Sequence, residues 1–388
     1  MTTIPYGRQE VTQADIDAVV AVLKSNYLSQ GPMVPEFEAA VCAASTAKYA
    51  VAVNSATSAL HIACLALGLG DGDWLWTSPN TFVASANCAR YCGANVDFVD
   101  IDPVTYNLSA DKLAEKLVIA KAQNRLPKIV VPVHFAGQSC DMQRIHELSQ
   151  EYGFHIIEDA AHGIGGRYQR DPIGCGKYSD ITTFSFHPVK IVTSAEGGMA
   201  VTNDPALADR MRRFRTHGIT GDATQMPLAQ DGPWHYQQID LGYNYRMTEL
   251  QAALGASQMA RLDDYVARRH QLAERYDELL GGLPLTIPWR HPDTYSAFHL
   301  YVIRLHLTDL SVSRREVYET LRARGVLVNI HYIPVHTQPY YQDLGFGLGQ
   351  FPNAETYYGE AISIPLFPTL TESQQDEVVV ALRRAMQR

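Results

Sequence analysis

The 388-residue sequence, with 46% hydrophobic and 19% charged residues, is long and apolar enough for a large domain and a smaller one, each with its own core. A formal net charge of −9 argues against a nucleic-acid-binding protein. The sequence shows no signal segment and no membrane-spanning apolar run, and its six cysteines are scattered without a CxxC pair. We therefore expect a cytoplasmic protein without a membrane or nucleic-acid partner and without a disulfide framework.

Residues 4–31 predict a short polar start, a helix and a turn. Apolar residues follow the N-cap candidate Thr12 at helical spacing: Ile16, Val19, Val20 and Leu23. The turn at residues 26–32 ends this helix, and residues 35–47 predict a second one.

From residue 49 onward, strand patterns alternate with helix patterns. Strands are predicted at residues 49–54, 74–78, 96–101, 128–135, 154–158, 181–186 and 199–202. Helices are predicted between them at residues 58–69, 110–122 and 142–152. Such alternation is typical of a largely parallel sheet with helices on both faces, so the predicted fold class is α/β.

Small polar residues follow the first of these strands. Backbone N–H groups and hydroxyls at the start of a helix bind anions, so Ser55, Ala56 and Thr57 can hold a phosphate group. A simple Ser/Thr helix cap is the alternative explanation of the same residues.

An acid and a lysine follow two later strands. Asp159 comes directly after the strand at residues 154–158, and Lys190 comes after the strand at residues 181–186, which Pro188 terminates. A lysine in apolar surroundings at a strand end loses solvation, and its neutral amine can form a Schiff base. Pyridoxal phosphate chemistry requires this pair, a lysine for the aldehyde and a carboxylate for the pyridinium nitrogen. A surface lysine and a helix-capping acid are the alternatives.

A phosphate cup, an acid and a lysine in this order are more specific than any one of them. Together with Phe184-Ser185-Phe186-His187 and Ala195-Glu196-Gly197-Gly198, they resemble the DegT–DnrJ–StrS sugar aminotransferases, within the fold-type I pyridoxal phosphate enzymes. The resemblance covers essentially the whole chain and is greatest to the transaminases of pseudaminic acid synthesis. It implies a large aminotransferase domain with a mainly parallel seven-stranded sheet at residues 1–250. A bridging helix and a smaller α+β C-terminal domain would occupy residues 251–388.

The resemblance also implies roles for individual residues in a homodimer with shared active sites. Lys190 and Asp159 would be catalytic. The cofactor, pyridoxal 5′-phosphate, would be bound by Ser55, Ala56, Thr57, Phe82, Asp159, His162, Ser185, Lys190 and the partner's Asn244. The nucleotide sugar would be bound by Tyr6, Tyr27, Leu28, Ser29, Gln30, His331 and Tyr332. From the residues alone, a core position explains Phe82, and a turn before a helix explains Asn244, equally well.

The rest of the chain predicts a long irregular segment and then mostly regular structure. The segment at residues 218–240 is rich in Gly, Pro, Gln and Asp, and such segments are usually functional or mobile. Residues 248–280 predict one long helix. In the smaller domain, strands are predicted at residues 300–305 and 326–331, and helices at residues 313–324 and 372–386. The spacing of His331 and His336 fits no zinc motif, so we expect no metal.

The implied reaction transfers the amino group of L-glutamate to C4 of a UDP-linked 4-keto-6-deoxy-N-acetylhexosamine (UDP-2-acetamido-2,6-dideoxy-β-L-arabino-hexos-4-ulose). Another keto sugar nucleotide, such as a dTDP-linked 3- or 4-keto-6-deoxyhexose, is the nearest alternative. A sugar dehydratase of the same fold is disfavoured because histidine replaces the Schiff-base lysine in that group, whereas Lys190 is present. A non-catalytic binding protein would not need Thr57, Asp159, Ser185 and Lys190 together.

Overall fold

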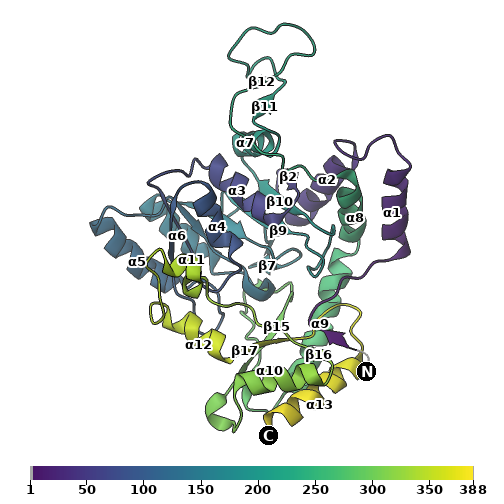
Figure 1. Ribbon diagram of the computed structural model, residues 1–388, viewed down its shortest axis with the longest axis vertical. Helices are drawn as coiled ribbons and strands as arrows, with labels where there is room; N and C mark the ends of the chain where they lie inside the picture. Colours follow the sequence, from purple (N-terminus) through teal and green to yellow (C-terminus); the bar gives the residue numbers. More distant parts are fainter. Residues whose placement is uncertain (1–2, 388) are drawn as a thin grey trace.

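The structure, a computed structural model, describes residues 3–387 and is built on one seven-stranded sheet (Figure 1). The strand order is β2-β10-β9-β6-β5-β3-β4. The strands are β2 (Tyr49–Val53), β3 (Trp74–Thr77), β4 (Asn95–Phe98), β5 (Ile129–Val131), β6 (His155–Asp159), β9 (Ile181–Ser185) and β10 (Gly198–Thr202). Neighbouring strands are parallel except where β10 pairs with β2 and β9. The mainly parallel seven-stranded sheet is therefore confirmed, with all seven predicted strands in it.

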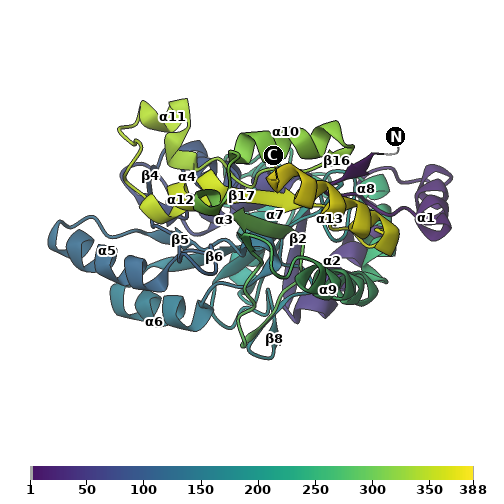
Figure 2. The same ribbon diagram turned by 90° about the horizontal axis from the view of Figure 1, so that it is seen from below.

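Helices cover both faces of this sheet (Figure 2). Alternate residues of a strand point to opposite faces. Val51 and Val53 of β2 join the core that includes α3, α4 and α7, whereas Ala50 and Ala52 join the core that includes α2 and α8. Because both faces are buried, the strands are near-continuous apolar runs, which is why the sequence reveals them.

Most of the helices agree with the sequence pattern. The helices are α1 (Gln13–Leu23), α2 (Met33–Ser45), α3 (Ala56–Ala66), α4 (Ala84–Tyr91), α5 (Ala110–Ala122), α6 (Met142–Tyr152), α7 (Pro205–Arg215), α8 (Glu249–Met259), α9 (Leu262–Leu279), α10 (Arg314–Ala323), α11 (Pro339–Gln342), α12 (Pro352–Glu360) and α13 (Glu372–Met386). The pattern does not predict α4, α11 or α12, and it merges α8 and α9 into one helix. Within residues 3–387, no helix is both long and apolar enough to span a membrane.

The break between α8 and α9 corrects the prediction of one helix over residues 248–280, and it has a physical cause. Asp15 is fully buried, and a buried carboxylate needs a charged partner. Arg261 leaves the helical conformation at the break and donates to both carboxylate oxygens of Asp15, at 2.7 and 2.8 Å.

The C-terminal part has its own core around a small antiparallel sheet. This sheet consists of β13 (Leu285–Thr286), β15 (Tyr301–Leu305) and β17 (Ala361–Ile364), and α10 and α13 contribute to its core. The N-terminal strand β1 (Ile4–Pro5) pairs in parallel with β16 (Val326–Leu327), so the start of the chain lies against this part.

Three predicted strands are shorter than expected. The strand predicted at residues 326–331 ends at Leu327. The strand predicted at residues 128–135 ends at Val131, and the one predicted at residues 96–101 ends at Phe98. Beyond Phe98 and Val131 only isolated bonds to the neighbouring strands remain, such as that from the N–H of Val99 to the carbonyl of Thr77 at 2.9 Å, and the backbone then finds other partners. The N–H of Phe135, for example, donates to the side chain of Asn107 at 2.9 Å.

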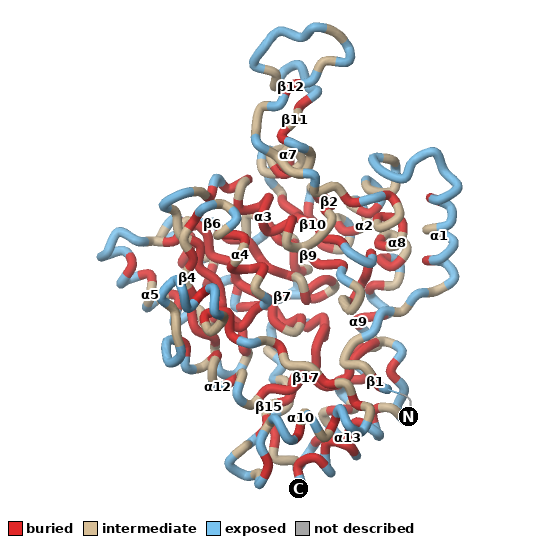
Figure 3. Tube along the Cα trace, viewed as in Figure 1, coloured by how far each residue is buried: buried red, intermediate tan, exposed pale blue. Residues whose placement is uncertain are grey.

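The segment at residues 218–240 projects from the body of the molecule beyond α7 (Figure 1). Only β11 (Ile219–Thr220) and β12 (Gln237–Gln238) pair within it, so it is mostly irregular, as predicted. Most of this segment is exposed (Figure 3). Its exposed apolar side chains include Trp234, at 73%. The remaining strands, β7 (Arg167–Tyr168), β8 (Asp171–Pro172) and β14 (Thr294–Tyr295), form a separate three-stranded sheet.

Candidate active site

The predicted site residues converge at one edge of the seven-stranded sheet. The carboxyl ends of β2, β6 and β9 meet the start of β10 there. Gly198, the first residue of β10, pairs with Ser185 on one side and with Val53 on the other. Asp159, the last residue of β6, pairs with Thr183 of β9. This register brings Asp159, Ser185 and the residues after Val53 to the same edge, where ligands bind in open α/β sheets.

The start of α3 is an open anion site. The hydroxyl of Ser55 accepts from the N–H of Ser58 at 3.1 Å, so the Ser55 side chain is engaged in capping the helix. In residues 3–387, the N–H groups of Ala56 and Thr57 donate to no other protein group. These two free donors at a helix N-terminus are suited to a phosphate group.

Gly198 lets β10 pack closely against the start of α3. A Cβ atom at this position would lie 2.4 Å from the carbonyl oxygen of Ser55 and 2.5 Å from the nitrogen of Ala56. A larger residue would therefore collide with the first turn of α3, and β10 could not run beside it.

The carboxylate of Asp159 is buried and held by two donors. Oδ2 accepts from the hydroxyl of Ser85 at 2.6 Å, and Oδ1 accepts from the N–H of Ala161 at 3.0 Å. The Ser85 hydroxyl also contacts that of Thr81 at 2.7 Å. The carboxylate is thus fixed in one orientation, with lone pairs left for a further donor.

Lys190 follows β9 in a turn, where its N–H donates to the carbonyl of His187 at 2.9 Å. Burial lowers the pKa of Lys190 from 10.5 to about 8, although the charge of Asp159 opposes the shift. A sizeable fraction of the amine is therefore neutral near pH 8, and a neutral amine is nucleophilic.

Two neutral histidines, His162 and His299, lie near this lysine. Burial, and then the charge of Lys190, lower the pKa of His162 well below its usual range. His162 Nδ1 accepts from the N–H of Ala136 at 3.2 Å, so Nε2 carries the proton and faces the hydroxyl of Tyr332 at 3.1 Å. The ring of His299 lies 4.4 Å from that of His162.

The segment after β16 brings three of the predicted substrate residues together. The ring of Tyr6 lies 5.2 Å from that of His331, and Tyr332 follows directly. The N–H of Tyr332 donates to the side chain of Asn80 at 3.3 Å, which ties this segment to the loop after β3. Phe82 on that loop is 59% exposed, and its ring lies 6.3 Å from that of Tyr332, so its face is open to a planar ligand.

The other predicted residues lie apart from this group. Residues Tyr27, Leu28, Ser29 and Gln30 are exposed, and the contacts of this turn are with the start of α8, where Glu249 N–H donates to the carbonyl of Leu28 at 3.0 Å. Asn244 is also exposed, beside α7.

Two residues of the site were missed by the sequence analysis. Ser85 holds Asp159, and His299 packs against His162. The proximity of Ser85 to the predicted ring-stacking residue Phe82 was a usable signal. For His299, the only signal was a lone polar residue in an apolar stretch before a strand.

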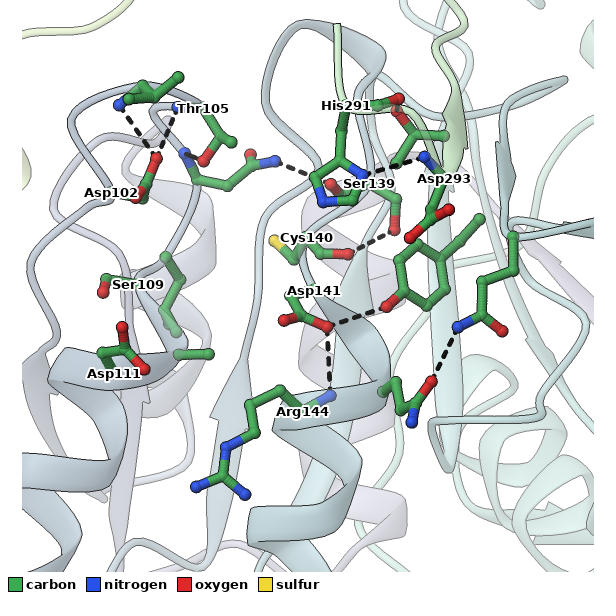
Figure 4. Close-up of a pocket in the computed structure, with 18 of the residues that line it drawn as sticks. Asp102, Thr105, Ser109, Asp111, Ser139, Cys140, Asp141, Arg144, His291 and Asp293 are labelled. Atoms are coloured by element: carbon green, nitrogen blue, oxygen red, sulfur yellow. Dashed lines mark hydrogen bonds between the residues drawn. The ribbon is translucent and has the colours of Figure 1, made fainter.

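A separate pocket of about 760 Å³ shares none of these residues (Figure 4). Its polar lining includes Asp102, Asp141, Arg144, His291 and Asp293. Within the described residues, no group of three or more His, Cys, Asp or Glu side chains is arranged to hold a metal ion.

Comparison with known proteins identifies the family. The profile of the DegT/DnrJ/EryC1/StrS aminotransferase family matches residues 9–383. The chain belongs to this family. Its aminotransferases use pyridoxal phosphate, and the chain is accordingly a pyridoxal-phosphate-dependent sugar aminotransferase.

Similar proteins cover nearly the whole aminotransferase chain. The spore coat polysaccharide biosynthesis protein SpsC of Bacillus subtilis is 40% identical over 383 residues, which are 98% of this chain and 96% of SpsC. Helicobacter pylori PseC, an aminotransferase involved in the biosynthesis of pseudaminic acid, is 30% identical with a TM-score of 0.88 over 99% of both chains. Streptococcus pneumoniae Spr1654, solved in a PMP form, is 28% identical with a TM-score of 0.88 over 99% of both chains.

The residues at this edge fit pyridoxal phosphate. The free N–H groups of Ala56 and Thr57 can hold the phosphate. The hydroxyl of Ser185 beside them makes no hydrogen bond to another group within residues 3–387, so it can also bind the phosphate. The fixed carboxylate of Asp159 can accept from a protonated ring nitrogen, and the desolvated amine of Lys190 can react with an aldehyde.

Proposed function

We propose that this aminotransferase transfers the amino group of L-glutamate to C4 of a UDP-linked 4-keto-6-deoxy-N-acetylhexosamine, as in pseudaminic acid synthesis. The similarity to PseC over 99% of both chains supports this substrate class. The observation that carries the amino transfer is the placement of the desolvated Lys190 amine and the anchored Asp159 carboxylate at the same sheet edge.

Lys190 has two proposed tasks. Bound pyridoxal phosphate supplies an aldehyde and a ring that accepts electrons from the substrate carbon. Lys190 Nζ would hold the aldehyde and, when displaced by an incoming amine, would take a proton from the substrate carbon and deliver it to the former aldehyde carbon of the cofactor. A base with a pKa near 8 can both accept and release that proton near neutral pH.

Asp159 and His162 would position the ring. The Asp159 carboxylate would keep the ring nitrogen protonated, and Ser85 and the Ala161 N–H would hold the carboxylate in place. Neutral His162 would contact the cofactor without adding a positive charge beside Lys190, because burial keeps its pKa low.

The sugar would bind on the side of the cofactor ring that residues 329–332 line. Tyr6, His331 and Tyr332 converge there, and Phe82 would stack on the ring. Tyr332 donates through its N–H to Asn80, so this segment is held against the loop that carries Phe82.

We further propose a cytoplasmic homodimer in which the partner completes the site. The exposed positions of Asn244 and residues 27–30 support this, since such residues can reach a neighbouring subunit. So do the exposed apolar side chains of α1: Ile16, Val20 and Leu23 are 46%, 36% and 58% exposed. Six free cysteines favour the reducing cytoplasm.

The test separates the two half-reactions. The protein in its pyridoxamine form is mixed with a panel of keto sugar nucleotides, and the aminated products are identified by mass spectrometry and NMR. Amination at C4 of the UDP-linked 4-keto-6-deoxy-N-acetylhexosamine with the highest kcat/KM supports the proposal. A higher kcat/KM for a dTDP-linked 3- or 4-keto-6-deoxyhexose would replace this substrate while keeping the amino transfer.

A further inference from the structure

Three cysteines and a histidine gather between α3 and α4, away from the proposed chemistry. His61 and Cys64 lie on α3, and Cys88 lies on α4, which Cys92 caps at its C-terminus. The two helices pack against each other (Figure 1). The thiol of Cys64 contacts the thiols of both Cys88 and Cys92, and the thiol of Cys92 also contacts His61.

The three thiols differ in what surrounds them. Cys64 and Cys88 are fully buried, and the Cys88 thiol donates to the carbonyl of Ser85 at 3.2 Å. Cys92 is partly exposed, so a small solute can reach it. It is thus both accessible and in contact with a second, buried thiol.

His61 adds an unused polar atom to this cluster. The residue is only 3% exposed, its Nδ1 contacts the hydroxyl of Tyr245 at 3.1 Å, and its buried Nε2 has no hydrogen-bond partner among the described residues. Nε2 is therefore the ring nitrogen that is free to interact with the Cys92 thiol.

The electrostatics distinguish Cys92 from the other accessible thiols. A hydrogen bond from Cys64, helped by His61, lowers the pKa of Cys92 from 9.0 to about 6. Cys42 and Cys175 are also partly exposed, but burial raises the pKa of each. Since thiolates are the reactive form of cysteine, the two residues are matched controls for Cys92.

We propose that Cys92 is a redox-sensitive thiol that forms a disulfide with Cys64 when the protein meets hydrogen peroxide. The described residues offer no arrangement for a metal ion, so metal binding does not explain the cluster. The contact between the two thiols supplies the pairing, and the partial exposure of Cys92 supplies the entry point.

The chemistry balances with peroxide as the two-electron oxidant. The Cys92 thiolate attacks one peroxide oxygen, the O–O bond breaks, and hydroxide leaves, which gives a sulfenic acid at Cys92. The Cys64 sulfur then attacks the Cys92 sulfur, the S–O bond breaks, and the thiol proton leaves with the oxygen as water. Two thiols and one peroxide become one disulfide and two waters.

Such a bond would join the two helices that carry part of the active site. The first turn of α3 presents the free N–H groups of Ala56 and Thr57, and α4 carries Ser85, which holds Asp159. Oxidation at Cys92 therefore acts close to both the phosphate site and the ring-nitrogen partner without touching either directly.

The test uses the full-length protein loaded with pyridoxal phosphate. It is treated with increasing hydrogen peroxide, denatured, alkylated with iodoacetamide and digested with trypsin. Cleavage after Arg90 separates Cys92 from the peptide that holds both Cys64 and Cys88, so the digest is repeated in a Cys88→Ser background to identify the partner. Cys42→Ser, Cys175→Ser and Cys92→Ser variants are treated in parallel.

We expect a cross-link between Cys64 and Cys92 at the lowest effective dose, retained in Cys88→Ser and in both control variants and lost in Cys92→Ser. Alkylation of the untreated protein at pH 7 should modify Cys92 at least tenfold faster than Cys42 and Cys175. Oxidation of Cys42 or Cys175 before Cys92 would overturn the proposal. A Cys92 that stops at the sulfenic acid or pairs elsewhere would also overturn it.

Discussion

At the scale of single residues, the ionisation of Lys190 is the feature that the proposed function most requires. Burial brings its pKa to about 8, and only the neutral amine can bind an aldehyde. The rate at which the cofactor-free protein takes up pyridoxal phosphate should therefore rise with pH and reach half its maximum near pH 8. Stopped-flow absorbance measures this rate. A profile that is flat from pH 6 to 9, or one centred above pH 10, would contradict the buried amine.

The same shift has a consequence for stability. Because the folded pKa is depressed, the unfolded chain binds more protons than the folded one between about pH 8 and 10.5, and the charged lysine penalises the fold below this window. Replacing Lys190 by Met should raise the Tm of the cofactor-free protein at pH 7, and the gain should shrink above pH 10. Calorimetry at pH 7 and above pH 10 measures the two Tm values. An equal gain in Tm at both pH values would rule out the lysine charge as the cause.

Ser85 should act through Asp159. In Ser85→Ala the carboxylate loses the donor at 2.6 Å, and a positioning hydrogen bond of about 1.4 kcal/mol corresponds to a roughly tenfold loss of kcat. Thr81→Val is the control, because Thr81 contacts Ser85 but not Asp159, and it should lose much less. Steady-state kinetics would contradict a positioning role for Ser85 if Ser85→Ala and Thr81→Val both kept full kcat. A change in KM alone would also contradict it.

The position of Asp159 and Lys190 at one sheet edge could be predicted from sequence because each follows a recognisable buried strand. Ser85 could not, because its contact with Asp159 spans 74 positions and depends on how α4 packs. The tautomer of His162 likewise follows from the N–H of Ala136, a backbone group that no sequence pattern reveals.

At the scale of elements, α1 presents an apolar strip to solvent, and a dimer would cover it. Burial of apolar area contributes about 25 cal/mol per Å², so placing charges on the strip should weaken association. We expect Val20→Glu combined with Leu23→Glu to shift the protein towards monomer and to weaken cofactor retention. Lys24→Glu on the same helix is the control for charge. Sedimentation measures the mass, and an unchanged dimer in the double variant would remove α1 from the interface.

The elements also show where sequence patterns suffice and where they fail. The strands of the central sheet are buried on both faces, so their apolar runs are unambiguous. Helix α4 has the sequence Ala-Ser-Ala-Asn-Cys-Ala-Arg-Tyr, whose small and polar residues show no apolar period. The long predicted helix is broken because Arg261 must reach the buried Asp15, a tertiary demand that overrides helical propensity.

At the scale of the whole molecule, the fold is consistent with one chain that binds both an amino donor and a keto sugar nucleotide. The cofactor residues lie at the sheet edge, whereas Tyr6, His331 and Tyr332 come from the two ends of the chain, joined by the pairing of β1 with β16. Under the proposed function, the chemistry and the sugar specificity would thus be carried by separate segments.

The most direct test of the account is the absorbance spectrum of the protein with pyridoxal phosphate, recorded before and after L-glutamate is added. The band of the lysine-bound cofactor should give way to that of the pyridoxamine form, with an equal amount of 2-oxoglutarate released. Lys190→Ala, folded by circular dichroism, should show neither change. A lysine-bound band that L-glutamate leaves unchanged would contradict the proposed donor, and its absence from the wild-type protein would remove Lys190 from its role.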